Sequence, residues 1–400
     1  MSEWKKEKLG DYVEVLSGFA FKSKDFTSEG VPVIKIKNIS PPNVSLEDLS
    51  YVPCNIATQN PRYILSQGDV LIAMTGSHIN QIASVVGRVG RIRYDVLSVL
   101  NQRVGKIVNK DDKKSSLDFV YYYLSQYEVK VELAQKAGGA ANQANISPKD
   151  IKDLMFPCPP VETQHRIATI LSRYDSLIEN YQKQIKLLEE AAQRLYKEWF
   201  IDLHFPRHEN TNIIDGVPEG WEKKKLIDLV DVQYGYAFDG HLFNSKGEGT
   251  PIVRIRNIPD GCTSDYTTEE ANDSYIVNDG DILIGMDGIF HINTWCGGKS
   301  YLVQRACSFR PKNVSMKGFI LQAIYEPIKF FENTVVGATV AHLGKKHIDS
   351  IELLVSNDDK MYKPFEKMFN ERQTLKTQLR LLTEARDRLL PKLISGEITV

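Results

Sequence analysis

The feature that most constrains the fold of this 400-residue chain is that its sequence is written twice. Residues 4–21 (WKKEKLGDYVEVLSGFAF) recur at 221–238 as WEKKKLIDLVDVQYGYAF, and five further blocks recur in the same order. Such a repeat predicts two copies of one structural unit. The other matched blocks are 32–39 with 251–258, 68–76 with 280–288, Gln102-Arg103 with Gln304-Arg305, Ile146 through Ile151 with Leu343 through Ile348, and 191–195 with 385–389.

The connections between the matched blocks differ far more than the blocks themselves. The separation between the copies falls from 217 to 194 residues along the chain, and most of the loss lies in 40–67 and 77–101 of the first copy. A scaffold that recurs while its connections differ is typical of one platform that carries two sets of loops. We therefore expect two related sites with different specificities.

Each copy is predicted to be a β-rich domain followed by a long helix. Short runs such as PVIKIKNI and GDVLIAM, separated by Gly, Asn and Pro, are typical of strands. Helical patches follow at 116–136 and 317–332, each with a glycine-containing loop after it.

After Pro159-Pro160 the period changes to alternate spacings of four and three, from Ile167 to Trp199. This heptad pattern predicts a coiled-coil helix over 162–200, about 58 Å long at 1.5 Å per residue. The second copy repeats the pattern from Phe365 to Leu393, with arginines on the apolar seam at 372 and 386 and Pro391 near its end. Its start, within 356–363, is not defined by the pattern.

The predicted fold class is α+β, with two β-rich domains joined by two long antiparallel coiled-coil helices in an internal pseudo-twofold repeat. The alternative is that each helix packs only on its own domain. The predicted segments are 1–161 for the first domain, 162–203 for the first spacer helix, 204–216 for a linker, 217–357 for the second domain, and 358–400 for the second helix and tail.

Composition excludes several classes of protein. No segment approaches about 18 apolar residues, and the N-terminus lacks a signal peptide, so neither a membrane span nor export is expected. Five scattered cysteines without a CxxC pair fit a reducing cytosol and a cytoplasmic protein. The net charge of −1 requires any DNA-binding charge to be local.

The sequence lacks the motifs that would indicate a DNA-modifying enzyme. There is no Asn/Asp-Pro-Pro-aromatic motif for a target adenine, and GGKS at 297–300 has Asn293 where a phosphate loop needs glycine. His204 and His208 flank Pro206 without a third ligand, so a structural role is favoured over a metal site. We therefore expect no catalytic residues, no metal and no cofactor of its own, although an enzyme with a cryptic site remains an alternative.

Several polar segments could read DNA. Lys35 with Lys37, and Arg254 with Arg256, are predicted to project from one face of a strand, although a solvated strand face would show the same pattern. Arginines interleaved with glycine form a second cluster, and loops that follow matching strands differ between the copies. The candidate DNA-binding residues are Lys35, Lys37, Asn38, Ser77, His78, Asn80, Gln81, Arg88, Arg91, Arg93, Asn142, Gln143, Arg254, Arg256, Asn257, Asp287, His291, Asn293, Lys299, Thr339 and His342.

Together these features resemble the specificity subunit of type I restriction–modification systems over essentially the whole chain. The motifs that carry the resemblance are the duplicated Trp-x-x-x-x-Leu opening, the duplicated GD-[VI]-L-I strand, FPCPPVETQHRIATIL at 156–171, RLYKEWFIDLHFP at 194–206 and ARDRLLPKLISGEI at 385–398.

The resemblance implies that each domain reads one half of a gapped double-stranded DNA site, with the helices fixing the spacing. It also implies docking of two DNA methyltransferase (modification) subunits that carry S-adenosylmethionine and methylate adenine. Restriction/translocase subunits that use ATP and Mg would join them. The competing interpretation outside DNA chemistry is a scaffold in which the coiled coil merely joins two β domains. Salt-sensitive DNA binding distinguishes the two.

Overall fold

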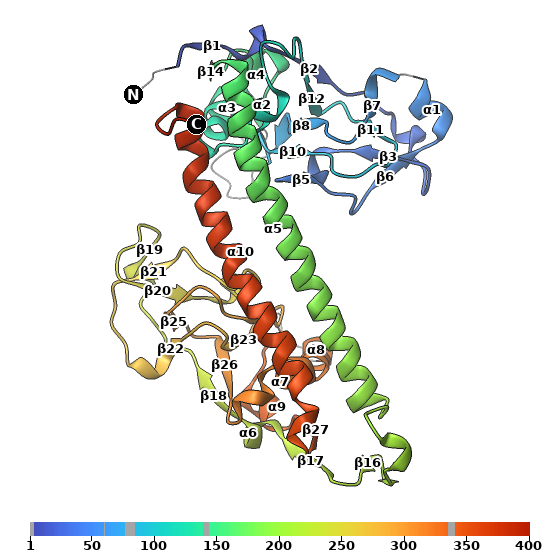
Figure 1. Cartoon of the computed structure of the whole chain (residues 1–400), viewed down its shortest axis with the longest axis vertical. Coiled ribbons are helices and arrows are strands. Elements are labelled where there is room, and N and C mark those ends of the chain that lie inside the picture. The colour runs from blue at the N-terminus through green and yellow to red at the C-terminus, as the bar shows by residue number, and fades with distance from the viewer. Residues whose placement is uncertain (1–3, 60, 77–84, 139–143, 335–340) are drawn as a thin grey trace. The chain divides into compact units, whose positions relative to one another are not determined.

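The structure of the chain, a computed structural model, describes residues 4–59, 61–76, 85–138, 144–334 and 341–400. The chain forms two units, one made of Met1–Ser176 with Glu384–Val400 and the other of Leu177–Thr383. Both combine sheets and helices, as the predicted α+β class requires (Figure 1). Within the described ranges, no helix has the length and apolar character needed to cross a membrane.

The first unit contains two main sheets. In β2 the residues alternate between buried and less buried, because one face packs on the helices, whereas β8 (Val-Leu-Ile-Ala) is covered on both faces. One sheet has the order β2 (Val13–Ser17), β12 (Val104–Asn109), β8 (Val70–Ala73), β10 (Val89–Arg91), β5 (Asn43–Val44) and β4 (Ile39–Ser40); the other has the order β6 (Ser50–Val52), β3 (Val31–Ile34), β11 (Ser98–Leu100) and β7 (Ile64–Leu65).

The described residues of the first unit also form two short ribbons and four short α-helices. The ribbons are β1 (Lys6–Lys8) with β14 (Met155–Pro157), and β9 (Thr75–Gly76) with β13 (Ala144–Asn145). The helices are α1 (Cys54–Thr58), α2 (Leu117–Leu124), α3 (Tyr127–Lys136) and α4 (Pro148–Lys152). The helical patch predicted at 116–136 is therefore confirmed as α2 and α3.

The second unit repeats this arrangement. Its sheets have the orders β18 (Val230–Tyr234), β26 (Ala306–Pro311), β23 (Ile282–Gly285), β24 (Ile292–Thr294), and β19 (Phe243–Asn244), β21 (Tyr266–Thr267), β20 (Thr250–Val253), β25 (Ser300–Leu302), β22 (Ile276–Val277). The ribbons are β17 (Trp221–Lys225) with β27 (Glu352–Ser356) and β15 (Ile213–Ile214) with β16 (Val217–Pro218). The helices are α6 (Leu226–Leu229), α7 (Lys317–Ala323), α8 (Tyr325–Thr334) and α9 (Lys345–Asp349).

Corresponding strands pair in the same way in both units. The order β2-β12-β8-β10 matches β18-β26-β23-β24, and the parallel pair β3·β11 matches β20·β25. The matched sequence blocks therefore form the same scaffold twice, which confirms the predicted internal repeat.

Two long helices, α5 (Val161–Tyr196, green in Figure 1) and α10 (Lys363–Ser395, red), match the predicted coiled-coil segments. A single π-helical turn, Lys197–Ile201, extends α5. Before α10, a 3₁₀ turn at Asp359–Met361 supplies the start that the sequence pattern left undefined. Pro391 does not end α10, which continues to Ser395.

The helix starts are fixed by different side chains in the two copies. Gln164 is fully buried; its carbonyl oxygen accepts from the N–H of Ser116 (2.9 Å) and its amide donates to the carbonyl of Pro159 (2.9 Å). At the other helix, the hydroxyl of Tyr362 donates to the carbonyl of Ser356 (2.8 Å) and accepts from its N–H (2.8 Å). A buried polar group needs such partners, so the Gln-containing motif of the first copy has a structural role.

The helices run antiparallel, as predicted. In the first unit Asp175 of α5 is ion-paired with Arg386 of α10, and in the second unit Glu189 of α5 is ion-paired with Arg372 of α10. From one pair to the other, α5 advances by 14 residues while α10 goes back by 14. The two arginines that interrupt the apolar seam of α10 therefore pair with acidic residues of α5, and polar residues on a seam select one register.

Candidate nucleic-acid interface

Three segments that are distant in sequence meet at one junction in each unit. In the first unit the N–H of Met74, just after β8, donates to the carbonyl of Arg103 (2.9 Å), and the N–H of Ile146 donates to the carbonyl of Met74 (2.9 Å). Close by, Thr75–Gly76 pairs with Ala144–Asn145. The predicted loop at 77–81 begins directly after Gly76, and the predicted loop at 142–143 ends directly before Ala144.

The second unit repeats the junction bond for bond. The N–H of Met286 donates to the carbonyl of Arg305 (2.9 Å), and the N–H of Leu343 donates to the carbonyl of Met286 (2.8 Å). Asp287 forms a β-bridge with His342. The ends of both predicted recognition loops therefore lie together in each unit, on a scaffold that recurs although the loops differ.

The second junction carries a charged cluster. The Asp287 carboxylate accepts a hydrogen bond from the guanidinium of Arg305 (2.7 Å) and contacts Nδ1 of His342 (2.6 Å). Burial alone would raise the pKa of Asp287, but the hydrogen bonds from His342 and Arg305 outweigh it and hold that pKa below its usual value. Arg305 and His342 are largely exposed. The Asp287 carboxylate therefore positions a guanidinium group and an imidazole ring at the surface.

Arg103 and Arg305 are the functional candidates that sequence reasoning missed. Their signal was available, because Gln-Arg recurs in both copies, but it served there only as evidence of the repeat. The structure places both arginines at the junction beside the loops. Of the predicted residues, His291 and Asp287 lie on the loop of the second unit and His342 lies across from it, with His291 half-buried.

Seven predicted site residues lie outside the described residues. They are Ser77, His78, Asn80, Gln81, Asn142, Gln143 and Thr339. Their assignment to DNA contact stays a prediction.

The paired basic residues do not lie on a strand, so this part of the secondary-structure prediction is wrong. Strands β3 and β20 end at Ile34 and Val253, and 3₁₀ turns follow at Ile36–Asn38 and Ile255–Asn257. Each turn is closed by an asparagine side chain, because Asn38 accepts the N–H of Lys35 (3.0 Å) and Asn257 accepts the N–H of Arg254 (2.9 Å). This capping gives the recurrent motif a structural explanation.

The basic side chains at these turns also have partners within the fold. The Lys35 ammonium lies 4.0 Å from the ring centre of Phe26 and donates to Ser50 (2.8 Å). Lys37 is paired with Asp48, the Arg254 guanidinium lies 5.5 Å from the ring centre of Phe243, and Arg256 pairs with Asp265 (2.6 Å). These contacts within the fold account for the basic side chains at the turns without any contact to DNA.

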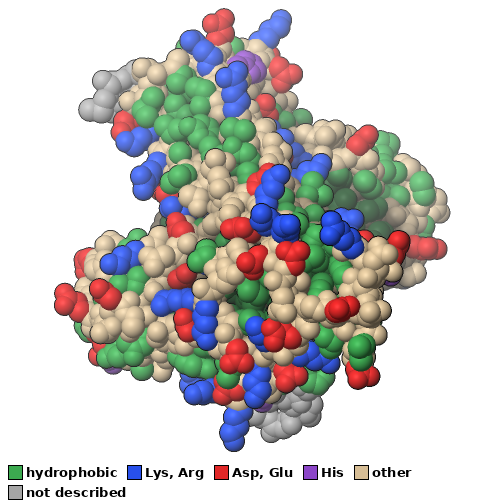
Figure 2. All heavy atoms as spheres, turned by 60° about the horizontal axis from the view of Figure 1, so that its bottom comes forward, with side chains coloured by type: hydrophobic (Ala, Val, Ile, Leu, Met, Phe, Trp, Pro, Cys, Tyr) green, Lys and Arg blue, Asp and Glu red, His purple; other side chains and the backbone are tan. Residues whose placement is uncertain are grey.

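The three arginines of the predicted glycine-rich cluster, Arg88, Arg91 and Arg93, lie in different environments in the structure. Arg91 is buried, pairs with Asp118 (2.7 Å) and lies 4.4 Å from the ring centre of Tyr121. Arg93 is exposed and Arg88 is half-buried, at the two ends of β10. Lys299 is exposed beside β25. Figure 2 shows basic and acidic side chains interspersed over the face it presents, in keeping with the net charge of −1.

Asn293, another candidate, belongs to a buried polar network that joins β24 to α10. Its carbonyl oxygen accepts from Arg372 (3.0 Å) and Lys376 (2.9 Å), and its amide donates to the carbonyl of Pro259 (2.7 Å). Lys376 also donates to the carbonyl of Thr294 (2.6 Å). The amide of Asn293 is thus fully used inside the unit, where it fixes the strand that follows the recognition loop.

Burial, and secondarily repulsion from Arg372, lowers the pKa of Lys376 to about 8. Folding therefore releases a proton between about pH 8 and the usual lysine pKa of 10.5, so the stability of the second unit is expected to rise with pH over that window. The other facing groups are Glu189 and the thiols of Cys296 and Cys262; burial raises the pKa of both thiols, which keeps them neutral.

This prediction is checked by denaturant unfolding of wild type and Lys376→Met. Between about pH 8 and about pH 9.5 the wild type should gain about 2 kcal/mol relative to the variant, at about 1.4 kcal/mol per pH unit. Lys367→Met, which changes an exposed lysine of the same helix, is the control and should leave the pH dependence unchanged. An equal pH dependence in wild type and Lys376→Met would contradict the buried titration.

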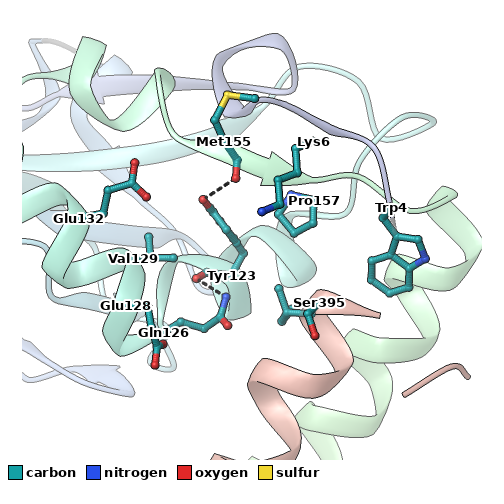
Figure 3. Close-up of a pocket in the computed structure, with 11 residues that line it drawn as sticks. Trp4, Lys6, Tyr123, Gln126, Glu128, Val129, Glu132, Met155, Pro157 and Ser395 are labelled. Carbon is teal, nitrogen blue, oxygen red and sulfur yellow. Dashed lines mark hydrogen bonds between the residues drawn. The ribbon is translucent and has the colours of Figure 1, made fainter. Parts of the chain in front are cut away.

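A second recurrent feature is a pocket near the β-ribbon of each unit. In the first unit the cavity is about 650 Å³, and Figure 3 shows Lys6 and Pro157 on the ribbon side, Tyr123 and Glu128 on the α2–α3 side, and Ser395 at the end of α10. In the second unit it is about 690 Å³, and the equivalent elements line it. The equivalent lining residues there include Lys223, Ala323, Glu326, Ile201 and Leu354.

Each pocket combines apolar surface with one lysine and two glutamates, and Lys6 with Lys223 and Glu128 with Glu326 lie at matched positions. Large apolar side chains are exposed at each, namely Met155 (48%) in the first and Phe330 (62%) and Ile201 (59%) in the second. Exposed apolar surface of this kind is typical of protein-binding sites.

The sequence comparisons agree with this architecture. The family model described as "Type I restriction modification DNA specificity domain" matches residues 1–190 and 218–380. The MjaIX type I restriction enzyme specificity subunit of Methanocaldococcus jannaschii is 25% identical, over 100% of this chain and 94% of its own length. The putative MjaX specificity subunit of the same organism is 26% identical over 63% of this chain and 59% of its own length.

Among solved structures, the S subunit of the type I restriction–modification system of M. genitalium aligns with a TM-score of 0.60. The alignment covers 98% of this chain and 96% of that chain at 18% identity, which supports the fold. Since the family model covers most of both copies and the repeated scaffold is that of a specificity subunit, the chain belongs to the type I restriction–modification DNA specificity family.

Proposed function

We propose that this chain directs DNA methylation by partner subunits to a bipartite, gapped DNA site, each unit recognising one half. The observation that carries the proposal is the loop junction, which recurs bond for bond in both units while the loops that leave it differ. One scaffold with two loop sets can read two different half-sites at equivalent positions. Membership of the specificity family supports the same function.

The proposal assigns catalysis to the partners. S-adenosylmethionine would bind to two modification subunits that methylate adenine, and ATP and Mg would serve restriction/translocase subunits. This chain would contribute recognition alone. An enzyme with a cryptic site is the competing candidate, and methyl transfer or DNA cleavage by the purified chain without partners would favour it.

The test is to co-express the chain with its modification subunit in a methylation-free host and to map methylated adenines by single-molecule sequencing. The expected result is a gapped two-part motif methylated once on each strand. Exchange of residues 217–357 for those of a relative should then change one half of the motif. A stable complex without methylation contradicts the proposal, and salt-insensitive or absent DNA binding favours the scaffold interpretation.

We further propose that the two recurrent pockets each dock one copy of the same partner. Equivalent elements build both pockets, and the matched pairs Lys6 with Lys223 and Glu128 with Glu326 support the same partner at each. Met155→Asp and Phe330→Asp each place a charge in an exposed apolar contact, and each is expected to weaken one docking site by about 30-fold or more. Native mass spectrometry should then show one partner copy per chain in place of two, and none for the double variant.

The matched control is Leu242→Asp, which charges a similarly exposed leucine (42%) outside both pockets. It should retain two partner copies. Two copies retained by both pocket variants would place the docking surface elsewhere on the chain.

A further inference from the structure

The recognition loop of the second unit, Asp287–His291, exposes one large apolar side chain. Ile289 is 59% exposed, whereas its neighbours Met286 and Phe290 are 6% and 0% exposed. The exposed isoleucine side chain gains none of the stabilisation that burial of apolar surface provides. The core therefore gives no reason for isoleucine at this position.

The backbone around Ile289 is held from both sides. The N–H of Gly288 donates to the carbonyl of Ala341 (3.0 Å), and Gly288 has φ +70°, in the left-handed region that favours glycine. The N–H of Phe290 donates to the Glu332 carboxylate (2.5 Å), and the buried Phe290 ring anchors the loop in the core. A side chain displayed by a backbone fixed in this way loses little conformational entropy on binding.

The polar groups beside Ile289 indicate which chemistry it meets. Asp287 precedes it by two residues, and the Arg305 guanidinium is hydrogen-bonded to Asp287 (2.7 Å). Guanidinium and carboxylate groups match donors and acceptors in the major groove of DNA, which also displays the C5 methyl group of thymine. The isoleucine side chain has no hydrogen-bonding atom, so the feature of that groove that it can recognise is this methyl group.

We propose that Ile289 is a specificity-determining residue that contacts the C5 methyl group of a thymine in the half-site read by the second unit. The inference rests on the proposed DNA-recognition function. The first copy has Ser77 directly after the matching Gly76, where the second copy has Ile289 after Gly288. The methyl contact is therefore specific to one half of the site.

The test uses the complex of the full chain with its methyltransferase subunits and duplexes that carry the mapped site. Each thymine of the second unit's half-site, on either strand, is replaced in turn by deoxyuridine, which lacks only the methyl group. At one position the wild-type complex should bind about fourfold more weakly, as expected for one buried methyl group. Ile289→Ala should bind the thymine and deoxyuridine duplexes equally.

Val314→Ala is the matched control. Val314 is 66% exposed but follows Pro311 at the end of β26 away from the loop, since Gly285 pairs with Ala306 at the near end. This variant should keep the thymine preference. Failure of the wild-type complex to methylate any site refutes the proposed function itself.

If the wild type is active, three results overturn the inference alone. They are a half-site without thymine, equal binding of every thymine and deoxyuridine pair by the wild type, and a preference that survives in Ile289→Ala. Uniformly weaker binding of all duplexes by Ile289→Ala, with the thymine preference intact, would instead indicate a wedge between bases.

Discussion

Replacing Arg305 by alanine is expected to lower methylation of the bipartite site by about 5- to 150-fold, the range for loss of one specific arginine contact of about 1–3 kcal/mol. The base preference should relax in one half of the motif only, and Arg103→Ala should have the same effect on the other half. Because Arg305 is largely exposed, its ion pair with Asp287 is expected to contribute little to stability, and the variant should fold normally. Methylated-site sequencing of both variants measures the effect.

The matched comparison is Arg256→Ala. Arg256 is similarly exposed and also pairs with an aspartate, Asp265, but it lies at the capped turn instead of the loop junction. Arg305→Lys adds a second test, since lysine keeps the positive charge but cannot form the bidentate hydrogen bonds that arginine forms with guanine. A larger loss in Arg256→Ala than in Arg305→Ala would move the recognition surface to the capped turns.

Replacing Arg386 by leucine is expected to destabilise the first unit by about 3–5 kcal/mol, the cost of leaving a buried charge without its partner. Asp175 is only 3% exposed and accepts hydrogen bonds from Arg386 (3.1 Å) and from the hydroxyl of Tyr122 (2.6 Å). Tyr122 alone cannot neutralise the carboxylate. Chemical denaturation of the full chain, followed by a probe in the first unit, measures the loss.

Two further variants separate charge from packing. Arg388→Leu changes an exposed arginine two residues along α10 and should cost little. Asp175→Asn combined with Arg386→Leu removes the stranded charge and should recover most of the loss, which a double-mutant cycle quantifies. An Arg386→Leu variant as stable as Arg388→Leu would show that the pair does not hold the helices in register.

Sequence reasoning worked best where the relevant interactions are local or repeated. The heptad spacing of Ile167 through Trp199 predicted α5 almost to its ends, because helix periodicity depends on residues three and four apart. It read Arg372 and Arg386 as irregularities of the second helix, however. Each proves to be a partner for an acidic residue on the other helix.

The site was predicted only in outline. The divergent loops were identified as recognition elements, and the structure brings their ends together at Met74 and Met286. The recurrence of basic residues near Asn38 and Asn257 pointed instead to a strand face, and here the pattern was misleading. The motif recurs because both units contain the same turn, which an asparagine side chain caps.

By itself the sequence determined that this protein is a duplicated α+β chain with two long helices and differing loops, since these properties follow from repeats and local periodicity. Only the tertiary structure decided that Arg91 is buried, that Asn293 is held by Arg372 and Lys376, and that Arg305 lies beside the recognition loop. The physical reason is that these roles depend on which distant segments pack together. The sequence alone does not reveal whether a polar side chain forms its hydrogen bonds within the fold or with DNA.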